Sequence, residues 1–241
     1  MPTRTVHLRA TPAEVGEALA DHLLGLVRAK PDAVIGLATG ATPEPLYDAL
    51  AERAGTAFRH ARFVALDEYV GLPEGSPLSF AATLWRQVLG PVGADPGRVF
   101  LPDGRSPDRA AAAAAYEAQL ERLGGVDLWL LGLGRNGHVA FNEPGSAERG
   151  RTRDVVLTAS TREANAAAFG SAGAVPDAAI TVGLGTLREH ARELALMVTG
   201  GAKAEILARA WKGPETRDVP ASLLRGVRVT GWFDEAAASL L

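Results

Sequence analysis

The sequence predicts an α/β fold: a single domain built on an open, mostly parallel sheet with helices on both faces. Three observations support this prediction. Apolar segments of strand length alternate with helical segments along the chain, an order typical of parallel sheets. Segments 33–38 and 126–131 are almost wholly apolar, as strands covered on both faces require. The chain has 241 residues and no linker-like stretch, so we expect one domain over residues 1–241.

The first part of the chain alternates three apolar segments with three helical segments. Thr11 and Glu14 form a capping box around Pro12, which predicts where the first helix begins. Thr42 is expected to cap the second helix, which Pro43 opens. We expect strands at 6–8, 33–38 and 62–66 and helices at 12–28, 43–54 and 78–89.

The rest of the chain continues this alternation. Residues 110–115 are all alanine, and their flanks favour a strongly helical segment over a low-complexity one. Ser160 and Glu163 form a second capping box, and Asp234 is expected to begin a terminal helix. We expect strands at 99–101, 126–131, 179–182, 193–198 and 227–232 and helices at 107–123, 160–169, 184–189 and 203–211.

Composition excludes several classes of protein. The formal net charge is −3 and no cluster of lysine and arginine accompanies aromatic residues, so we expect no nucleic-acid partner. No apolar segment of about twenty residues and no secretion signal is present, so we expect no membrane partner and a cytoplasmic location. The absence of cysteine excludes disulfides, thiolate catalysis and cysteine-ligated metals.

The densest group of chemically useful side chains follows the apolar segment 126–131. Three glycines within residues 132–137 end the strand, and His138, Asn142 and Glu143 come next before a proline. Ligands of open α/β sheets bind beyond the carboxyl ends of the strands. We therefore place the active site in this loop.

The same loop matches the G-x-G-x-x-G fingerprint of dinucleotide-binding proteins, with Asp154 near the offset of a ribose-binding acid. We reject that interpretation for two reasons. The fingerprint needs a helix to begin within it, whereas residues 138–144 are loop-like and end in proline. Asp154 also precedes an apolar segment, where the fingerprint requires an acid at the far end of a strand.

Three segments predict a site for an anion. Residues 39–43 join a strand to a helix, so free backbone N–H groups and the helix dipole converge there. Lys203 lies at a second junction of this kind. Arg162 is expected in the first turn of a helix, where a cation opposes the helix dipole unless an anion binds nearby. No nucleotide P-loop is present.

Asp67 and Glu68 come directly after the strand at 62–66. Such an acidic pair often only solvates a loop or caps the next turn, but its place at the carboxyl end of a strand favours a catalytic role. The basic segment 148–153 is either a mobile flap over an acidic ligand or a solvated loop, and both interpretations stay open. We expect a mobile lid around 146–170.

Four loops of this chain, taken together, resemble the signature loops of the glucosamine-6-phosphate deaminase family in sequence, order and spacing. They are 37–43 (LATGATP), 66–72 (LDEYVGL), 134–144 (GRNGHVAFNEP) and 200–203 (GGAK). Weaker agreement at 151–153, 161–165 and 220–222 extends the resemblance over nearly the whole chain. It implies the modified Rossmann-like fold shared by the deaminases and the 6-phosphogluconolactonases.

The resemblance also implies a reaction, the conversion of glucosamine 6-phosphate and water into fructose 6-phosphate and ammonium without a metal or an organic cofactor. His138 would open the sugar ring, with Glu143 orienting its imidazole and Asn136 supporting the geometry. Asp67 would be the base that moves a proton from C2 to C1. The substrate phosphate would be held by Thr39, Gly40, Ala41, Thr42, Arg162 and Lys203.

The chain departs from the family pattern at three places. Asn136 replaces an aspartate of some members and cannot titrate, so proton transfer rests on His138 and Glu143. Ala41 replaces a small glycine or serine and loses at most a hydroxyl contact. Segment 153–156 lacks the lysine that allosteric members use to bind N-acetylglucosamine 6-phosphate, so we expect no activation by that compound.

Three other functions compete with the deaminase. They are a galactosamine-6-phosphate deaminase, a 6-phosphogluconolactonase and a non-catalytic sugar-phosphate sensor; the last would need a DNA-reading module that we do not find in the sequence. The sequence leaves open which amino-sugar epimer is preferred and whether the protein is a monomer or a homo-oligomer. His7, His22, His60 and His190 lack a functional neighbourhood, and Trp129 is expected in the core.

Overall fold

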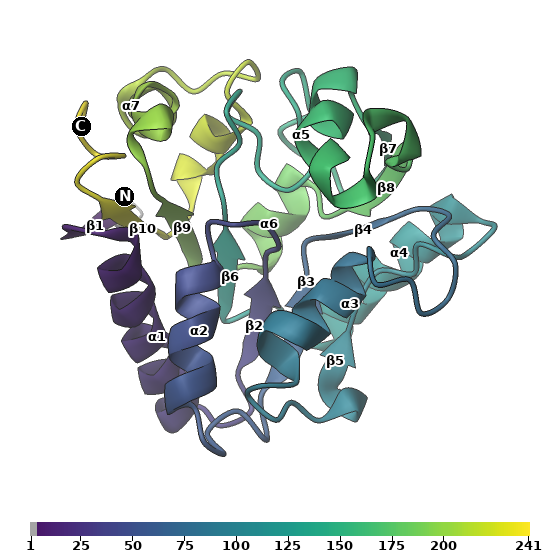
Figure 1. Cartoon of the computed structure of the whole chain (residues 1–241), viewed down its shortest axis with the longest axis horizontal. Coiled ribbons are helices and arrows are strands. Elements are labelled where there is room, and N and C mark those ends of the chain that lie inside the picture. The colour runs from purple at the N-terminus through teal and green to yellow at the C-terminus, as the bar shows by residue number, and fades with distance from the viewer. Residues whose placement is uncertain (1–3) are drawn as a thin grey trace.

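The computed structural model describes residues 4–241, in which a seven-stranded sheet forms the centre (Figure 1). Its strands lie in the order β1-β10-β9-β6-β2-β3-β5 and every neighbouring pair is parallel, which confirms the predicted fold class. We call it the main sheet. Its strands are β1 (Arg4–Arg9), β2 (Val34–Leu37), β3 (Arg62–Ala65), β5 (Val99–Phe100), β6 (Leu128–Leu131), β9 (Leu194–Val198) and β10 (Val229–Asp234).

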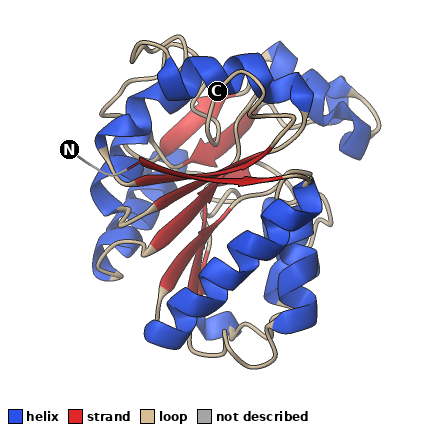
Figure 2. Cartoon of the chain, turned by 90° about the vertical axis from the view of Figure 1, so that its left-hand side faces the viewer, coloured by secondary structure: helices blue, strands red, loops and turns tan. Residues whose placement is uncertain are grey.

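Helices cover both faces of the main sheet (Figure 2). None of the helices described over residues 4–241 is both long and apolar enough to cross a membrane. The helices are α1 (Pro12–Ala29), α2 (Glu44–Arg53), α3 (Phe80–Leu84, continued by a π-helical turn at Trp85–Leu89), α4 (Arg109–Arg122), α5 (Ala159–Phe169), α6 (Leu184–His190) and α7 (Ala204–Lys212), with a longer 3₁₀ segment at Pro220–Gly226.

A second sheet of three short antiparallel strands lies beside the main sheet. Its order is β4 (Asp67–Tyr69), β8 (Ala178–Thr181) and β7 (Arg153–Val156), and we call it the small sheet. Residues 67–69 therefore form a strand rather than the expected loop. The chain passes from one sheet to the other at Leu66, whose carbonyl accepts a hydrogen bond from the Val182 N–H at 2.8 Å.

Trp129 occupies the centre of the core, as predicted, and is fully buried. Its ring lies against Gly36 on the neighbouring strand, where an added Cβ would stand 1.9 Å from a ring atom. A glycine within a buried strand is costly in conformational entropy. Here it is required because the indole fills the space that any side chain at residue 36 would need.

All three helices begin within one residue of their predicted starts, but the predicted capping residue is correct only at α1 and wrong at α2 and α5. The Thr11 hydroxyl accepts from the Glu14 N–H at 3.2 Å. At α2 the N-cap is Pro43, so Thr42 makes no capping bond. At α5 the N-cap is Thr158 rather than Ser160, because Thr158 takes the extended conformation and accepts from the Thr161 N–H at 3.2 Å.

The predicted terminal helix is also wrong. Asp234 is the last residue of β10, and residues 235–240 form turns. Its carboxylate accepts from the Ala237 N–H at 2.8 Å and from the Gly200 N–H at 3.0 Å. The side chain thus holds the loop after β9 while it closes the turn that follows β10.

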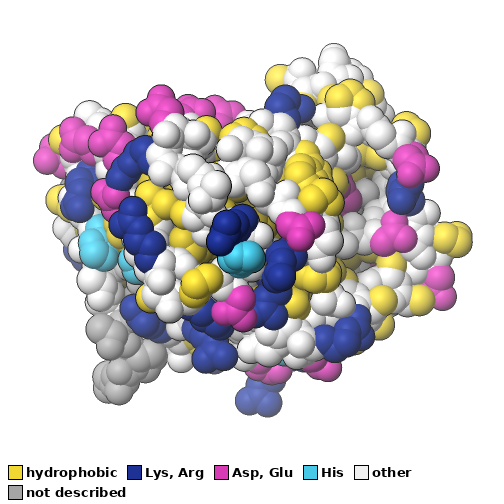
Figure 3. All heavy atoms as spheres, turned by 90° about the horizontal axis from the view of Figure 1, so that it is seen from below, with side chains coloured by type: hydrophobic (Ala, Val, Ile, Leu, Met, Phe, Trp, Pro, Cys, Tyr) yellow, Lys and Arg dark blue, Asp and Glu magenta, His cyan; other side chains and the backbone are white. Residues whose placement is uncertain are grey.

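Charges of both signs share the surface. On the face shown in Figure 3, basic side chains lie beside acidic ones and histidines, with neutral surface between them. That mixture agrees with a formal net charge of only −3 spread over 241 residues.

Candidate active site

Four loops with predicted site residues leave four adjacent strands of the main sheet. In the strand order, β9, β6, β2 and β3 are consecutive and parallel, so their carboxyl ends meet at one edge. The loops are 199–203 after β9, 132–145 after β6, 39–43 after β2 and the passage to β4 after β3. The topology therefore gathers Lys203, His138, Thr39 and Asp67 at the same edge.

Glycines in the loop after β6 serve to pack the histidine. An added Cβ on Gly134 would stand 2.2 Å from an atom of the His138 ring, so the imidazole lies directly against the backbone. The Gly134 N–H donates to the His138 carbonyl at 2.9 Å, and Gly137 has a φ of +87° that favours glycine. No helix begins within residues 132–145, as predicted, whereas a dinucleotide-binding turn would need one.

Asn136 stands between His138 and Glu143. Its Oδ1 lies 2.7 Å from His138 Nδ1, and its Nδ2 donates to Glu143 Oε2 at 2.5 Å. Because the amide donates to the carboxylate, its oxygen faces the imidazole, and we infer that Nδ1 carries a proton. That tautomer leaves Nε2 of His138 free for a ligand.

Glu143 is held as a carboxylate, with its pKa lowered to about 2. The interaction with His138 contributes most, although Nδ1 lies 3.7 Å from Glu143 Oε1 and is too far for a direct hydrogen bond. Burial opposes the shift, whereas the donors Thr161 and Asn136 add to it. The half-buried negative charge thus lies beside the imidazole of His138.

Asp67 has the opposite electrostatic setting. Its side chain is buried, and its pKa is raised to about 8, chiefly by desolvation and secondly by the charge of Glu68. Within residues 4–241 its carboxylate accepts no hydrogen bond that would favour the ionised form. A carboxyl that gains and loses a proton near neutral pH suits a general base.

Glu68 has a structural role. Its carboxylate accepts from the N–H groups of Tyr69, Phe80 and Ala81 at 2.8 to 3.0 Å. The last two belong to the first turn of α3, whose free N–H groups need an acceptor. Of the two expectations for the acidic pair, capping thus applies to Glu68, while Asp67 remains available for chemistry.

Lys203 joins two of the loops at the candidate site. Its Nζ donates to the Leu133 carbonyl at 2.6 Å, which ties the start of α7 to the loop after β6. Burial lowers its pKa, and the nearby Arg135 lowers it further. In the loop after β2, Gly40 has a φ of +108° and is exposed together with Ala41, while Thr39 and Thr42 are half-buried.

Arg162 does not join the other predicted phosphate ligands. Its Nη2 contacts the Gly173 carbonyl at 3.4 Å, and its Nε is buried without a hydrogen-bond partner among residues 4–241. Gly173 comes shortly after α5, so this contact stays within the segment that contains the helix. Figure 1 shows α5 grouped with β7 and β8 to one side of the main sheet, and Arg162 belongs to that group.

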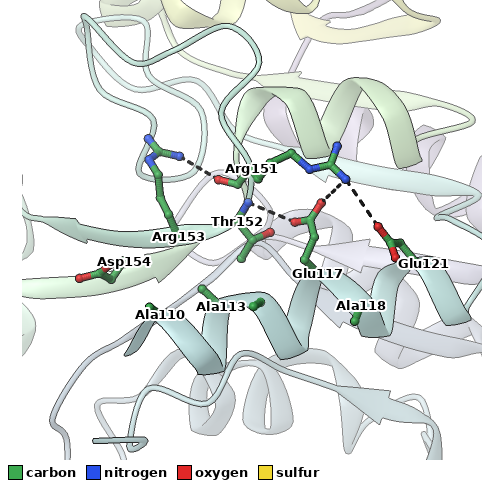
Figure 4. A pocket seen from close by; sticks show the side chains of 10 residues that line it. Ala110, Ala113, Glu117, Ala118, Glu121, Arg151, Thr152, Arg153 and Asp154 are labelled. Atoms are coloured by element: carbon green, nitrogen blue, oxygen red, sulfur yellow. Dashed lines mark hydrogen bonds and ion pairs between the residues drawn. The ribbon is translucent and has the colours of Figure 1, made fainter. Parts of the chain in front are cut away.

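The segment 148–153 is attached at Arg151. Its guanidinium pairs with Glu117 at 2.9 Å, with Glu121 at 3.7 Å and with Glu189, and Figure 4 shows it reaching across a hollow toward α4. The hollow is lined by one face of α4 and by residues 151–154, and it contains none of the predicted site residues. A mobile lid at 146–170 stays a prediction. If the lid moved as a whole, the guanidinium of Arg151 would have to break its ion pairs with these three carboxylates.

Two residues to which the sequence analysis assigned no role support the loop after β6. Thr161, the buried residue of α5, donates from its hydroxyl to Glu143. Asn142 is fully buried; its Nδ2 donates to the carbonyls of Val139 and Val182, and its Oδ1 accepts from Arg153 at 3.0 Å. The Asn142 contacts tie the loop to the small sheet.

Comparison with known proteins places the chain among sugar-phosphate enzymes. Residues 8–232 match the family described as glucosamine-6-phosphate isomerases/6-phosphogluconolactonase. The chain is 45% identical over 230 residues to the glucosamine-6-phosphate deaminase of Pseudarthrobacter chlorophenolicus, which covers 94% of this chain and 88% of that protein. It is 46% identical over 231 residues to that of Streptomyces coelicolor, with coverages of 94% and 88%.

Solved structures agree with these matches. A structure described as a monomeric glucosamine-6-phosphate deaminase has a TM-score of 0.93 at 37% identity and covers 98% of this chain and all of its own. The 6-phosphogluconolactonase of Trypanosoma brucei has a TM-score of 0.80 at 22% identity, with full coverage of both chains, and shares the fold. The resemblance to the deaminases is thus confirmed, and the chain belongs to the glucosamine-6-phosphate isomerase/6-phosphogluconolactonase family.

Proposed function

We propose that this protein is a glucosamine-6-phosphate deaminase that converts glucosamine 6-phosphate and water into fructose 6-phosphate and ammonium. The observation that carries the proposal is the pairing of a buried base with an acid–base histidine at one sheet edge. Asp67 has a pKa raised to about 8, while Glu143 beside His138 has a pKa lowered to about 2. Two carboxyls tuned in opposite directions indicate separate roles in one reaction.

His138 would open the sugar ring. Ring opening moves a proton from the C1 hydroxyl to the ring oxygen, so one group must first accept and then donate it. Nε2 of His138 is suited to both steps because Nδ1 is engaged by Asn136. Glu143 would stabilise the imidazolium formed in between, as the carboxylate partner of a histidine does in other enzymes.

Asp67 would carry out the isomerisation. As a carboxylate it takes the proton from C2, while the C1 carbonyl oxygen takes a proton from the ammonium group of the substrate, which gives a cis-enolamine. Asp67 then returns its proton to C1. The product is an iminium at C2, which water hydrolyses to the ketone and ammonium. These steps use only side chains and water, so the proposal contains no metal and no organic cofactor.

The substrate phosphate would bind at the edge formed by residues 39–42 and Lys203. The backbone N–H groups that open α2 and the ammonium of Lys203 supply a positive field for an anion. Arg162 would also bind the phosphate if α5 moved, like a lid, toward this edge of the main sheet. Binding energy from the phosphate, remote from C1 and C2, would then hold the reacting carbons against Asp67.

We also propose that the protein acts in the cytoplasm and has no nucleic-acid or membrane partner. A phosphorylated sugar is charged and does not cross a lipid bilayer unaided, so an enzyme that consumes it works where it is made. A net charge of −3 without a basic cluster agrees with the absence of nucleic-acid binding. Fractionation of cells that express the protein would test its location.

The first test measures ammonium and fructose 6-phosphate formed from glucosamine 6-phosphate. We expect equal amounts of the two products from the wild-type protein and a loss of at least a hundredfold in kcat for Asp67→Asn, because the amide cannot accept the proton from C2. Galactosamine 6-phosphate and 6-phosphogluconolactone serve as controls. Turnover of either control without turnover of glucosamine 6-phosphate would replace the proposed function by that of the control substrate.

A further inference from the structure

We propose that Thr161 is a positioning residue for the reaction, through which helix α5 holds the Glu143 carboxylate in place beside His138. This inference rests on the function proposed above. The contact that carries it is a hydrogen bond from the Thr161 hydroxyl to Glu143 Oε1. Thr161 and Glu143 are 18 residues apart, so the bond joins a helix to a separate loop.

The direction of this hydrogen bond is set by its neighbours. Thr158 Oγ1 accepts from the Thr161 N–H at 3.2 Å, and its own hydroxyl donates to Thr161 Oγ1 at 3.0 Å. The Thr161 hydroxyl therefore has its proton free for an acceptor, and the acceptor is the Glu143 carboxylate. A hydroxyl chain that starts at the cap of α5 thus ends on the carboxylate of the candidate site.

The two oxygens of Glu143 have different partners. Oε2 accepts from Asn136, whose amide oxygen faces His138, while Oε1 accepts from Thr161 and is the oxygen nearest to His138 Nδ1, at 3.7 Å. A carboxylate held at both oxygens cannot rotate about its last torsion. Thr161 consequently fixes which oxygen faces the imidazole.

Burial makes Thr161 an attachment point of α5 near the start of the helix, while Phe169 at its end packs against Tyr69. Thr161 is the buried residue of this helix, with 7% of its surface exposed, while the other ten residues of α5 are half-buried or exposed. Its neighbour Arg162 is the predicted phosphate ligand on the same turn. A movement of α5 that brings Arg162 to a phosphate therefore acts on Glu143 as well.

The experiment compares Thr161→Val with Thr161→Ser in steady-state kinetics. Valine keeps the shape and removes the donor, so we expect kcat to fall roughly tenfold with KM changed less than threefold. Serine keeps the donor, so we expect kcat close to that of the wild type. Thr152→Val is the matched control, because Thr152 is equally buried and its hydroxyl has no partner within residues 4–241.

A double-mutant cycle tests whether Thr161 acts through Glu143. In a Glu143→Gln background we expect Thr161→Val to cost little further kcat, because the carboxylate it positions is gone. An equal loss in both backgrounds, an effect on KM alone, or a Thr161→Ser variant as slow as Thr161→Val would overturn the proposal. A fully active Thr161→Val would do the same.

Hydrogen exchange of the α5 amides tests the same contact without turnover. We expect Thr161→Val and Glu143→Gln each to speed exchange over residues 159–169, and the double variant to resemble the single ones. Unchanged exchange in both single variants would refute the attachment of α5 through this contact. An inactive wild-type protein with the expected exchange pattern would instead reject the proposed function and leave the contact established.

Discussion

Asp67 and Glu68 show how two adjacent acids acquire different functions from their surroundings. Glu68 receives three backbone N–H groups and caps α3, whereas Asp67 is buried without such donors and has a pKa raised to about 8. Sequence position predicted that this pair lies at the candidate site. It did not separate the two roles, because the N–H groups of α3 lie 12 and 13 residues away along the chain.

The raised pKa of Asp67 predicts the pH dependence of the rate. Because the base must be ionised, we expect kcat/KM to rise with pH and to level off above a midpoint near pH 8. Glu68→Gln should move that midpoint to lower pH, since the charge of Glu68 is the second cause of the shift. A midpoint near pH 4 in the wild type would contradict a buried base.

The same group predicts the pH dependence of stability. The folded pKa of Asp67 lies above the unfolded value, so the folded state binds more protons and loses stability as pH rises from about 4 to about 8. Each unit of pKa difference corresponds to about 1.4 kcal/mol. We expect Asp67→Asn to raise the Tm at pH 8 and to do so much less at pH 4. An equal Tm change at both pH values would argue against this ionisation.

At the scale of elements, long apolar segments were predicted well and short mixed ones were not. Strands β2, β6 and β9 are buried on both faces, and a strand of this kind is recognisable in the sequence as a continuous apolar segment. Strands β4 and β7 have three and four residues with charged members, so no periodicity identifies them. The cap of α5 was misplaced because Thr158, Ser160 and Thr161 all carry hydroxyls that can cap.

Two glycines in different elements predict opposite effects of alanine. Gly25→Ala in α1 should stabilise the protein by about 0.5–1 kcal/mol, because an added Cβ meets nothing within 4 Å and alanine favours a helix. Gly36→Ala in β2 should destabilise it by about 1–3 kcal/mol, because the Cβ would overlap the Trp129 ring. Denaturant unfolding measures the free energy of unfolding of both variants. Changes of the same sign in the two variants would contradict the packing described for β2.

At the scale of the molecule, the sequence placed most of the candidate site but not its supports. His138, Asp67 and Lys203 follow strand ends, which is where the topology of an α/β sheet brings loops together. Thr161 reaches Glu143 from a separate helix, and Asn142 holds the loop through contacts with distant backbone. Contacts of this kind depend on how elements pack, and no local pattern records them.

Because the chain passes from the main sheet to the small sheet between β3 and β4, the residues of the candidate site are distributed over both sheets. His138, Lys203 and residues 39–42 are attached to the main sheet, whereas Asp67 lies on β4 of the small sheet, whose edge strand β7 leads into α5. The junction between the two sheets is therefore a suitable boundary for redesigning the reaction. Replacing the small sheet together with α5 would exchange the proposed base along with Thr161 and Arg162, and would keep residues 39–42, Lys203 and His138 on the main sheet, so new chemistry on phosphorylated sugars can be sought by redesigning those exchanged segments.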